Sequence, residues 1–220
     1  MTVAKESTIS RYIGLSSDVK PTGATVPKGS TFREYDTNDT YITPDQTNWV
    51  IQDSKSVKRF KVLTVLAATG AYASGDILSN SEVASSAITW NFNAVAGYNG
   101  GGGKIVQAQV ETTEDTPSAT LTMYLFTATP TCVLTDNVAG ALPLATDVST
   151  GIYLGKIDFP AFSVWGVANA NSMLYAAASC MPFYFTTSSG ADDLKGVLIT
   201  STGATFASKE LAITLWVKRD

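Results

Sequence analysis

Five carboxylates are the side chains best suited by type to acid–base chemistry in this sequence. They are Glu111, Glu114, Asp115, Asp192 and Asp193. Two such acids on either side of a bound sugar could hydrolyse a glycosidic bond. Most of the five, however, lie in segments whose composition predicts turns, where acids are ordinarily solvated. We therefore predict that none of them is catalytic.

The chain contains no histidine. This absence excludes Ser-His-Asp and Cys-His nucleophilic mechanisms, and it excludes histidine-ligated zinc. Cys132 and Cys180 are the only cysteines, and a zinc site built from thiolates alone needs four. Because both lie in apolar, strand-like segments, we expect two buried free thiols, although whether they ever pair stays open. The sequence thus predicts a protein that is not an enzyme and that has no metal and no cofactor.

A glycine-rich segment, Gly97–Lys104, has a superficial likeness to a phosphate-binding loop. The residue five positions before Gly103 is Tyr98 rather than glycine, and Lys104 is followed by Ile105 rather than by serine or threonine. Both positions are essential to the phosphate-binding motif. We predict instead a flexible loop between two strands.

Charge is unevenly distributed along the chain. Residues 1–61 carry nine Lys or Arg and seven Asp or Glu, whereas residues 62–220 carry six and twelve. With a net charge of −4 and no extended basic patch, the chain is not expected to bind nucleic acid. The first 14 residues lack the apolar core of a signal peptide, and no apolar run approaches the ~18 residues of a membrane span. We expect cytosolic synthesis and no membrane association.

The segment Gly29–Val50 alternates bulky and polar residues between short turn-forming segments. This pattern predicts a small antiparallel meander of three strands, at Thr31–Asp36, Thr40–Thr43 and Trp49–Gln52. Such a ribbon cannot stand alone, so it must dock on its own chain, on a sister subunit or on a partner. We predict an extended N-terminal arm over residues 1–28, the meander module over 29–56, and the main domain over 57–220.

The main domain shows a regular succession of short β patterns bounded by turn signals. This spacing predicts an all-β fold, an antiparallel β-sandwich of jelly-roll type. No long segment has helical periodicity, although residues 168–178 could form one short helix or a loop leading into a strand. The strands are expected at Arg59–Leu66, Asp76–Leu78, Ala87–Asn91, Lys104–Thr112, Leu121–Thr127, Gly151–Ile157, Met181–Thr187, Gly196–Thr200 and Leu211–Lys218.

Two parts of the chain resemble structural proteins of tailed-bacteriophage virions. The first is the N-terminal block, with a Pro-Xaa-Gly-Ser spacer and an aromatic meander that ends in Asn-Trp-Val; the second is a series of motifs through the main domain. The matching residues of the first are Pro27–Ser30, Phe32, Tyr35-Asp36, Tyr41-Ile42 and Asn48-Trp49-Val50. Those of the second are Tyr72–Glu82 (YASGDILSNSE), Met123–Phe126, Asp136-Asn137 and the closing segment 196–220.

The resemblance implies a virion component with a jelly-roll body, of the capsid decoration (cement) protein type. It implies a homotrimer that binds the major capsid protein on the outer surface of the capsid, after synthesis in the bacterial host cytoplasm. It carries no catalytic residues. The expected contacts to capsid or neighbouring subunit are the bulky residues of the arm and meander, Ile9, Tyr12, Ile13, Phe32, Tyr35, Tyr41 and Trp49.

Two other functions stay open at this point. One is a tail, baseplate or head-fibre adaptor whose β-sandwich binds a host glycan, which would require exposed aromatic residues such as Tyr98 and Tyr153 around a cleft. The other is a carbohydrate hydrolase, which would require two facing acids about 5–10 Å apart in a groove.

Overall fold

The structure is a computed structural model that describes residues 9–37, 39–54, 57–67, 70–112, 119–160, 163–164, 172–206 and 210–219. The chain divides into two compact units. The first, here called the N-terminal module, comprises Met1–Lys58 with Lys218–Asp220, and the second, here called the body, comprises Arg59–Val217. The division follows Lys58 and is therefore close to the fall in charge density near residue 61.

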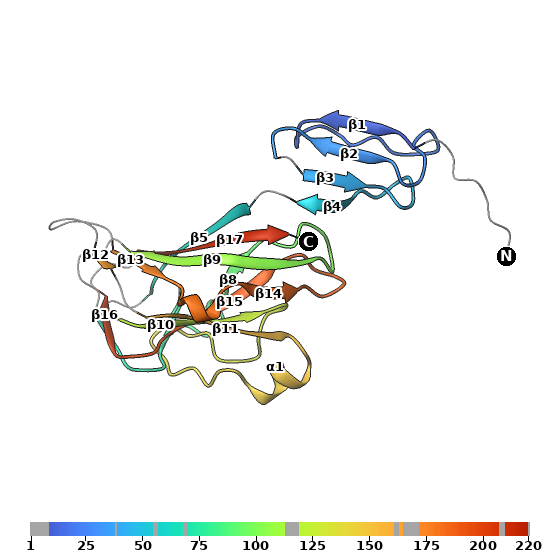
Figure 1. The fold of residues 1–220 in the computed structure, drawn as a ribbon. Coiled ribbons are helices and arrows are strands. Elements are labelled where there is room, and N and C mark those ends of the chain that lie inside the picture. The colour runs from blue at the N-terminus through green and yellow to red at the C-terminus, as the bar shows by residue number, and fades with distance from the viewer. Residues whose placement is uncertain are drawn as a thin grey trace. The chain divides into compact units, whose positions relative to one another are not determined.

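The N-terminal module is built on a single sheet of four strands. These are β1 (Arg11–Gly14), β2 (Thr31–Glu34), β3 (Asp39–Ile42) and β4 (Val50–Ser54), in the order β1-β2-β3-β4 (Figure 1). Strand β1 pairs with β2 in parallel, whereas the other two pairings are antiparallel. The sheet is thus one strand larger than the predicted meander, and the extra strand comes from the segment expected to be an extended arm.

The segment between β1 and β2 provides the cover that the ribbon requires. The Trp49 indole N–H donates to the Pro21 carbonyl at 2.7 Å, and the Gly23 amide donates to the Gln46 carbonyl at 2.8 Å. Val26, from the same segment, is only 1% exposed. Of the three docking surfaces that the sequence left open, the structure therefore provides the first, the protein's own chain.

Two large sheets form most of the body. The first has the antiparallel order β11-β10-β15, and both β7 and β8 then pair with β15. Its strands are β7 (Ile77–Leu78), β8 (Trp90–Phe92), β10 (Leu121–Phe126), β11 (Tyr153–Phe159) and β15 (Leu194–Thr200).

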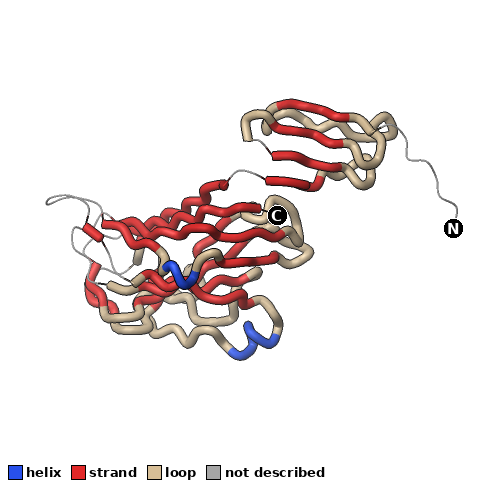
Figure 2. The backbone as a smooth tube through the Cα atoms, in the orientation of Figure 1, coloured by secondary structure: helices blue, strands red, loops and turns tan. Residues whose placement is uncertain are grey.

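The second sheet of the body has the order β12-β13-β9-β17-β5, and β14 also pairs with β9. Its strands are β5 (Val57–Val65), β9 (Gly102–Thr112), β12 (Ser163–Val164), β13 (Ser172–Tyr175), β14 (Phe183–Thr186) and β17 (Glu210–Arg219). A separate two-stranded pairing joins β6 (Gly70–Tyr72) to β16 (Ala204–Phe206). In the described residues, helix is confined to α1 (Ala145–Ser149) and a 3-10 turn at Ala178–Cys180 (Figure 2).

The core of the body lies between these two sheets. Strands β9 and β17 of one sheet and β10 and β15 of the other each contribute apolar side chains that are almost completely buried. They include Ile105, Val110, Leu121, Met123, Leu125, Leu198, Leu211, Ile213 and Leu215. The predicted all-β, antiparallel sandwich is therefore confirmed, whereas its jelly-roll connectivity stays a prediction. Within the described chain, no helix has the length and apolar character needed to cross a membrane.

Candidate functional site in the N-terminal module

Four of the seven predicted contact residues form the module's own aromatic core. Register places Tyr12 beside Phe32, and Phe32 beside Tyr41, so all three share one face of the sheet. The Trp49 ring meets this face edge-on, with its centroid 6.1 Å from that of Tyr12 and 6.0 Å from that of Phe32. Phe32 is only 3% exposed, and the other three are half-buried. These aromatic rings therefore hold the module together.

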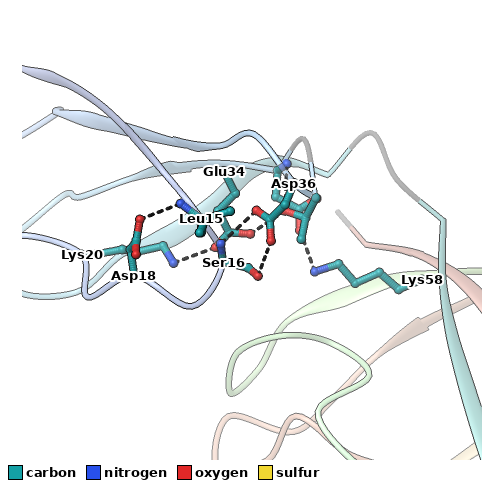
Figure 3. A network of polar contacts seen from close by, with 9 residues as sticks. Leu15, Ser16, Asp18, Lys20, Glu34, Asp36 and Lys58 are labelled. Atoms are coloured by element: carbon teal, nitrogen blue, oxygen red, sulfur yellow. Dashed lines mark hydrogen bonds and ion pairs between the residues drawn. The ribbon is translucent and has the colours of Figure 1, made fainter.

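A buried ion pair lies against the aromatic core. The Lys20 ammonium is 2.7 Å from a carboxylate oxygen of Glu34, which is 2% exposed (Figure 3). The same ammonium is 4.2 Å from the ring centroid of Tyr41 and 5.1 Å from that of Phe32. Burial raises the pKa of the Tyr41 hydroxyl, and the carboxylates of Glu34 and Asp39 raise it further. The tyrosine consequently stays protonated and neutral beside the ion pair.

A second buried carboxylate of the module, that of Asp39, is also paired with a cation. Its side chain is fully buried and is 2.7 Å from the Lys58 ammonium, which brings the start of β3 to the last residues of the module (Figure 3). The second oxygen of Glu34 accepts a hydrogen bond from the Thr37 hydroxyl. Because each of these buried carboxylates lies against a cation, removal of the cation would leave an uncompensated buried charge.

The turn after β1 is fastened to the turn after β2. The Ser16 hydroxyl and amide both donate to the Asp36 carboxylate, at 2.6 and 2.9 Å (Figure 3). These bonds, the hydroxyl bond first, lower the pKa of Asp36. Asp18 accepts the Leu15 amide at 2.7 Å and closes the same turn (Figure 3). The polar network of the module thus holds β1 and its loop onto the meander.

The other three predicted contact residues lie on the surface. Ile9 is 49% exposed, Ile13 is 68% exposed and Tyr35 is 61% exposed. The structure therefore separates the seven residues into four that form the aromatic core and three that are exposed. The prediction grouped them because bulky residues were chosen by type, without regard to the side of the sheet on which each lies.

The ion pairs of the module were not predictable from local patterns in the sequence. Lys20 and Glu34 are 14 positions apart, and no local pattern indicates that they pair. The sequence did contain a pattern that indicates which side chains face away from the core. In β1 and β2, the core positions alternate with Arg11, Ile13, Thr31 and Arg33. Applied to these short segments, the two-residue period of a strand would have separated outer from inner residues.

Two of the five acids considered for catalysis have structural partners in the body, and among the described residues no side-chain contact is seen for Asp192. Glu111 is paired with the Lys61 ammonium and accepts a hydrogen bond from the Gln109 amide. Asp193 accepts the Ala94 amide at 2.8 Å and lies 3.5 Å from the Lys195 ammonium. Glu114 and Asp115 lie outside the described residues. In the described chain, no three or more Cys, Asp or Glu residues form a group that could hold a metal ion.

The glycine-rich segment connects β8 to β9 and is anchored at its centre. The Gly100 amide donates to the Ala191 carbonyl at 2.9 Å, and the Thr187 amide and hydroxyl both donate to the Gly101 carbonyl. Gly100 has a φ of +74°, a conformation that favours glycine. The glycines therefore serve a hydrogen-bonded turn, in contrast to the freely bending loop that we predicted.

The aromatic residues proposed for glycan stacking, Tyr98 and Tyr153, are both half-buried. The Tyr153 ring centroid lies 5.5 Å from that of Phe126 and 6.2 Å from that of Tyr124. Tyr153 thus packs on a side cluster of the body's core, and this leaves less of its ring for stacking on a sugar.

Cys132 and Cys180 are both free thiols. Cys132 is buried, and burial together with the carboxylate of Asp147 raises the pKa of its thiol to about 11. Cys180 ends the 3-10 turn and is only partly buried, so the expectation of two buried thiols holds for the first cysteine alone.

Cys132 should resist alkylation in the folded protein. Because the thiolate is the reactive form, we expect iodoacetamide at pH 8 to modify Cys132 on the order of 100-fold more slowly than an unhindered thiol. Mass spectrometry of a Cys180→Ser variant would give the rate at Cys132, and a Cys132→Ser variant would serve as the matched control. Equal rates for the two native cysteines would contradict the burial of Cys132.

No family model, curated protein or solved structure was found to match this chain in sequence or fold.

Proposed function

We propose that this protein is a non-enzymatic structural component of a bacteriophage virion that binds the outer surface of the capsid and stabilises it. The observation that carries the proposal is the division of the chain into a small N-terminal module with its own core and a larger β-sandwich body. The resemblance of both parts to tailed-phage virion proteins supports the same function. Glu111 and Asp193, which are engaged in ion pairs and hydrogen bonds, fit a structural role.

In this proposal the module attaches the protein and the body adds mass and contacts over the shell. The body would associate as a homotrimer and so present three modules to neighbouring copies of the major capsid protein. Once one module has bound, the others act at high effective concentration, so individually weak contacts give tight attachment. The expected consequence for the particle is a higher barrier to rupture of the shell.

We prefer a role on the capsid surface to a role as an adaptor at the tail, baseplate or head fibre that binds a glycan. A glycan site of the kind considered needs aromatic rings exposed around a cleft. Tyr98 and Tyr153 are half-buried, and the Tyr153 ring packs on Phe126 and Tyr124. This packing weighs against the adaptor.

Deletion of residues 1–52 should remove binding to the shell and leave the body folded. The body retains its core because the apolar side chains that form it all come from residues 60–217. We expect the affinity for capsids stripped of this protein to fall by roughly 100-fold or more, since the multivalent attachment is lost. Co-sedimentation with stripped capsids measures binding, and circular dichroism checks the fold. A folded truncated protein that binds as well as the full chain would contradict the proposed role of the module.

A further inference from the structure

The sheet of the N-terminal module ends at β1, which has one side paired with β2 and one open side (Figure 1). The Thr31 amide donates to the Ser10 carbonyl at 3.0 Å, and the Tyr35 amide donates to the Gly14 carbonyl at 3.0 Å. In a parallel ladder, alternate residues direct both of their backbone groups to the same neighbouring strand. Ser10, Tyr12 and Gly14 therefore direct theirs toward β2.

The two residues that alternate with these direct their backbone groups away from β2. The N–H and C=O groups of Arg11 and Ile13 consequently lie along the open side of β1. Within the described chain, no hydrogen bond to these four groups is seen. We call the four groups the open edge of β1.

A strand edge of this kind is a template on which a further strand can form hydrogen bonds. Proteins commonly protect such an edge with a proline or a β-bulge. Residues 9–14 contain no proline, and the register of β1 with β2 runs over four residue pairs without a shift. Ile9 and Ile13, at two-residue spacing from Arg11, are 49% and 68% exposed. The open edge is thus regular and has exposed apolar side chains beside it.

A second copy of this chain fits the open edge poorly. A two-fold antiparallel pairing of β1 with itself, centred on Tyr12, would bring the two Arg11 side chains to diagonal positions within reach of each other. A pairing centred on Arg11 would place them directly opposite, and like charges placed so destabilise a sheet. A two-fold contact also differs from the three-fold symmetry proposed for the body. These arguments favour a strand from a different protein.

We propose that the open edge of β1 binds an extended segment of the major capsid protein as an added strand. Main-chain hydrogen bonds to Arg11 and Ile13 hold the segment, and its apolar side chains at alternate positions lie beside Ile9 and Ile13. So few bonds make a weak contact in each module, and the multivalent attachment strengthens it. This proposal rests on the proposed function and makes it specific, because it names the edge used and the conformation of the segment bound.

Proline substitution tests the open edge at single backbone groups. Proline has no N–H and is accepted on an edge strand where that group would face away from the sheet. Arg11→Pro and Ile13→Pro should therefore leave the module folded. Each should weaken binding of the full chain to stripped capsids on the order of 100-fold, because a bond is lost and the ring obstructs the added strand.

Arg11→Thr and Ile13→Thr are the matched controls. They replace the same side chains but keep the N–H groups, and threonine is favoured in strands. Each should weaken binding by at most about fivefold, since only a cross-strand side-chain contact is lost. Circular dichroism and thermal unfolding of all four variants would verify that they are folded.

Hydrogen exchange with mass spectrometry follows the same amides in the unsubstituted protein. In the free protein the Arg11 and Ile13 amides should exchange rapidly, whereas the Thr31 and Tyr35 amides, which are bonded to β1, should be protected. Binding to stripped capsids should slow exchange at Arg11 and Ile13 by about tenfold or more. This measurement decides the question even if a proline variant fails to fold.

The outcomes distinguish failure of this inference from failure of the proposed function. Loss of binding in the proline variants, with binding kept in the threonine variants and protection of the two amides on the capsid, supports the inference. If the parent binds but the two amides stay unprotected, or if the proline and threonine variants bind equally, the function stands and the open edge is not the docking site. Should the parent itself fail to bind stripped capsids, both proposals fall. Proline variants that sediment more slowly as free protein and still bind capsids would assign the edge to contacts between copies of this chain and overturn the inference.

Discussion

Replacement of Lys20 by methionine is expected to destabilise the N-terminal module by about 3 kcal/mol, because it leaves a buried carboxylate without its cation. Glu34 is 2% exposed and lies 2.7 Å from the Lys20 ammonium, whose side chain is itself only 18% exposed. The substitution also removes the ammonium from the faces of Phe32 and Tyr41. The cost is that of an uncompensated charge, so it should exceed the net contribution of the intact pair.

Hydrogen exchange would show whether the destabilisation is confined to the module. The Gly29 and Thr43 amides are bonded within the module, to Thr43 and Ser30 respectively. Their exchange should accelerate on the order of 100-fold in the variant, because they report local opening. The matched control is Lys28→Met, which removes an exposed ammonium and should leave exchange unchanged. The double variant Lys20→Met with Glu34→Met should recover part of the loss, since no charge is then left buried. Equal exchange in the Lys20 and Lys28 variants would refute the structural role of the pair.

Truncation of Leu198 to alanine is expected to destabilise the body by about 3 kcal/mol, through lost burial and the cavity that remains. Leu198 is fully buried on the central strand β15, where it pairs with Met123 on one side and with Leu78 on the other. Neighbours on both sides are held by strand pairing, so the site has little freedom to collapse around the cavity. Denaturant unfolding monitored by circular dichroism would measure the change in the free energy of unfolding.

The same truncation at Leu63 is the matched control. Leu63 lies on β5 of the same unit but is 61% exposed, so Leu63→Ala should alter stability by no more than about 0.5 kcal/mol. Comparable losses at the two leucines would mean that the core does not lie between the two sheets as described.

The sandwich was largely predictable from the sequence because its signals are local. Each of the nine strands expected in the body overlaps a strand of the structure, and the match is close for β9 (Gly102–Thr112) and β17 (Glu210–Arg219). Alternation of β-branched or aromatic residues with small polar ones, bounded by Gly, Asp and Asn, marks such strands. Residues 168–178 were left undecided between helix and loop, and the structure has β13 at Ser172–Tyr175. This segment is rich in alanine, a residue that does little to distinguish a strand from a helix or a loop.

The architecture of the N-terminal module was harder to predict because its contacts are distant in sequence. Strand β1 pairs in parallel with β2, which begins 17 residues after β1 ends. No turn motif in the sequence predicts a parallel pairing of this kind. The short run Arg11–Gly14 has only two full alternations, too few to distinguish a strand from an extended arm. The Lys20–Glu34 pair depends on this arrangement and could not be foreseen without it.

Phe32, Tyr41 and Trp49 were expected to contact a partner, but their rings are used within the module. On the other side of the same strands, Arg11, Ile13 and Arg33 are exposed.

The number of copies of this protein in each virion tests the proposed function most directly. Quantitative mass spectrometry of purified particles would give the ratio of this chain to the major capsid protein. A protein that decorates the shell follows the symmetry of the capsid, so we predict on the order of hundreds of copies in each particle. A count of about a dozen or fewer would match the symmetry of a tail or baseplate instead, and it would contradict the proposal that this protein binds the capsid surface.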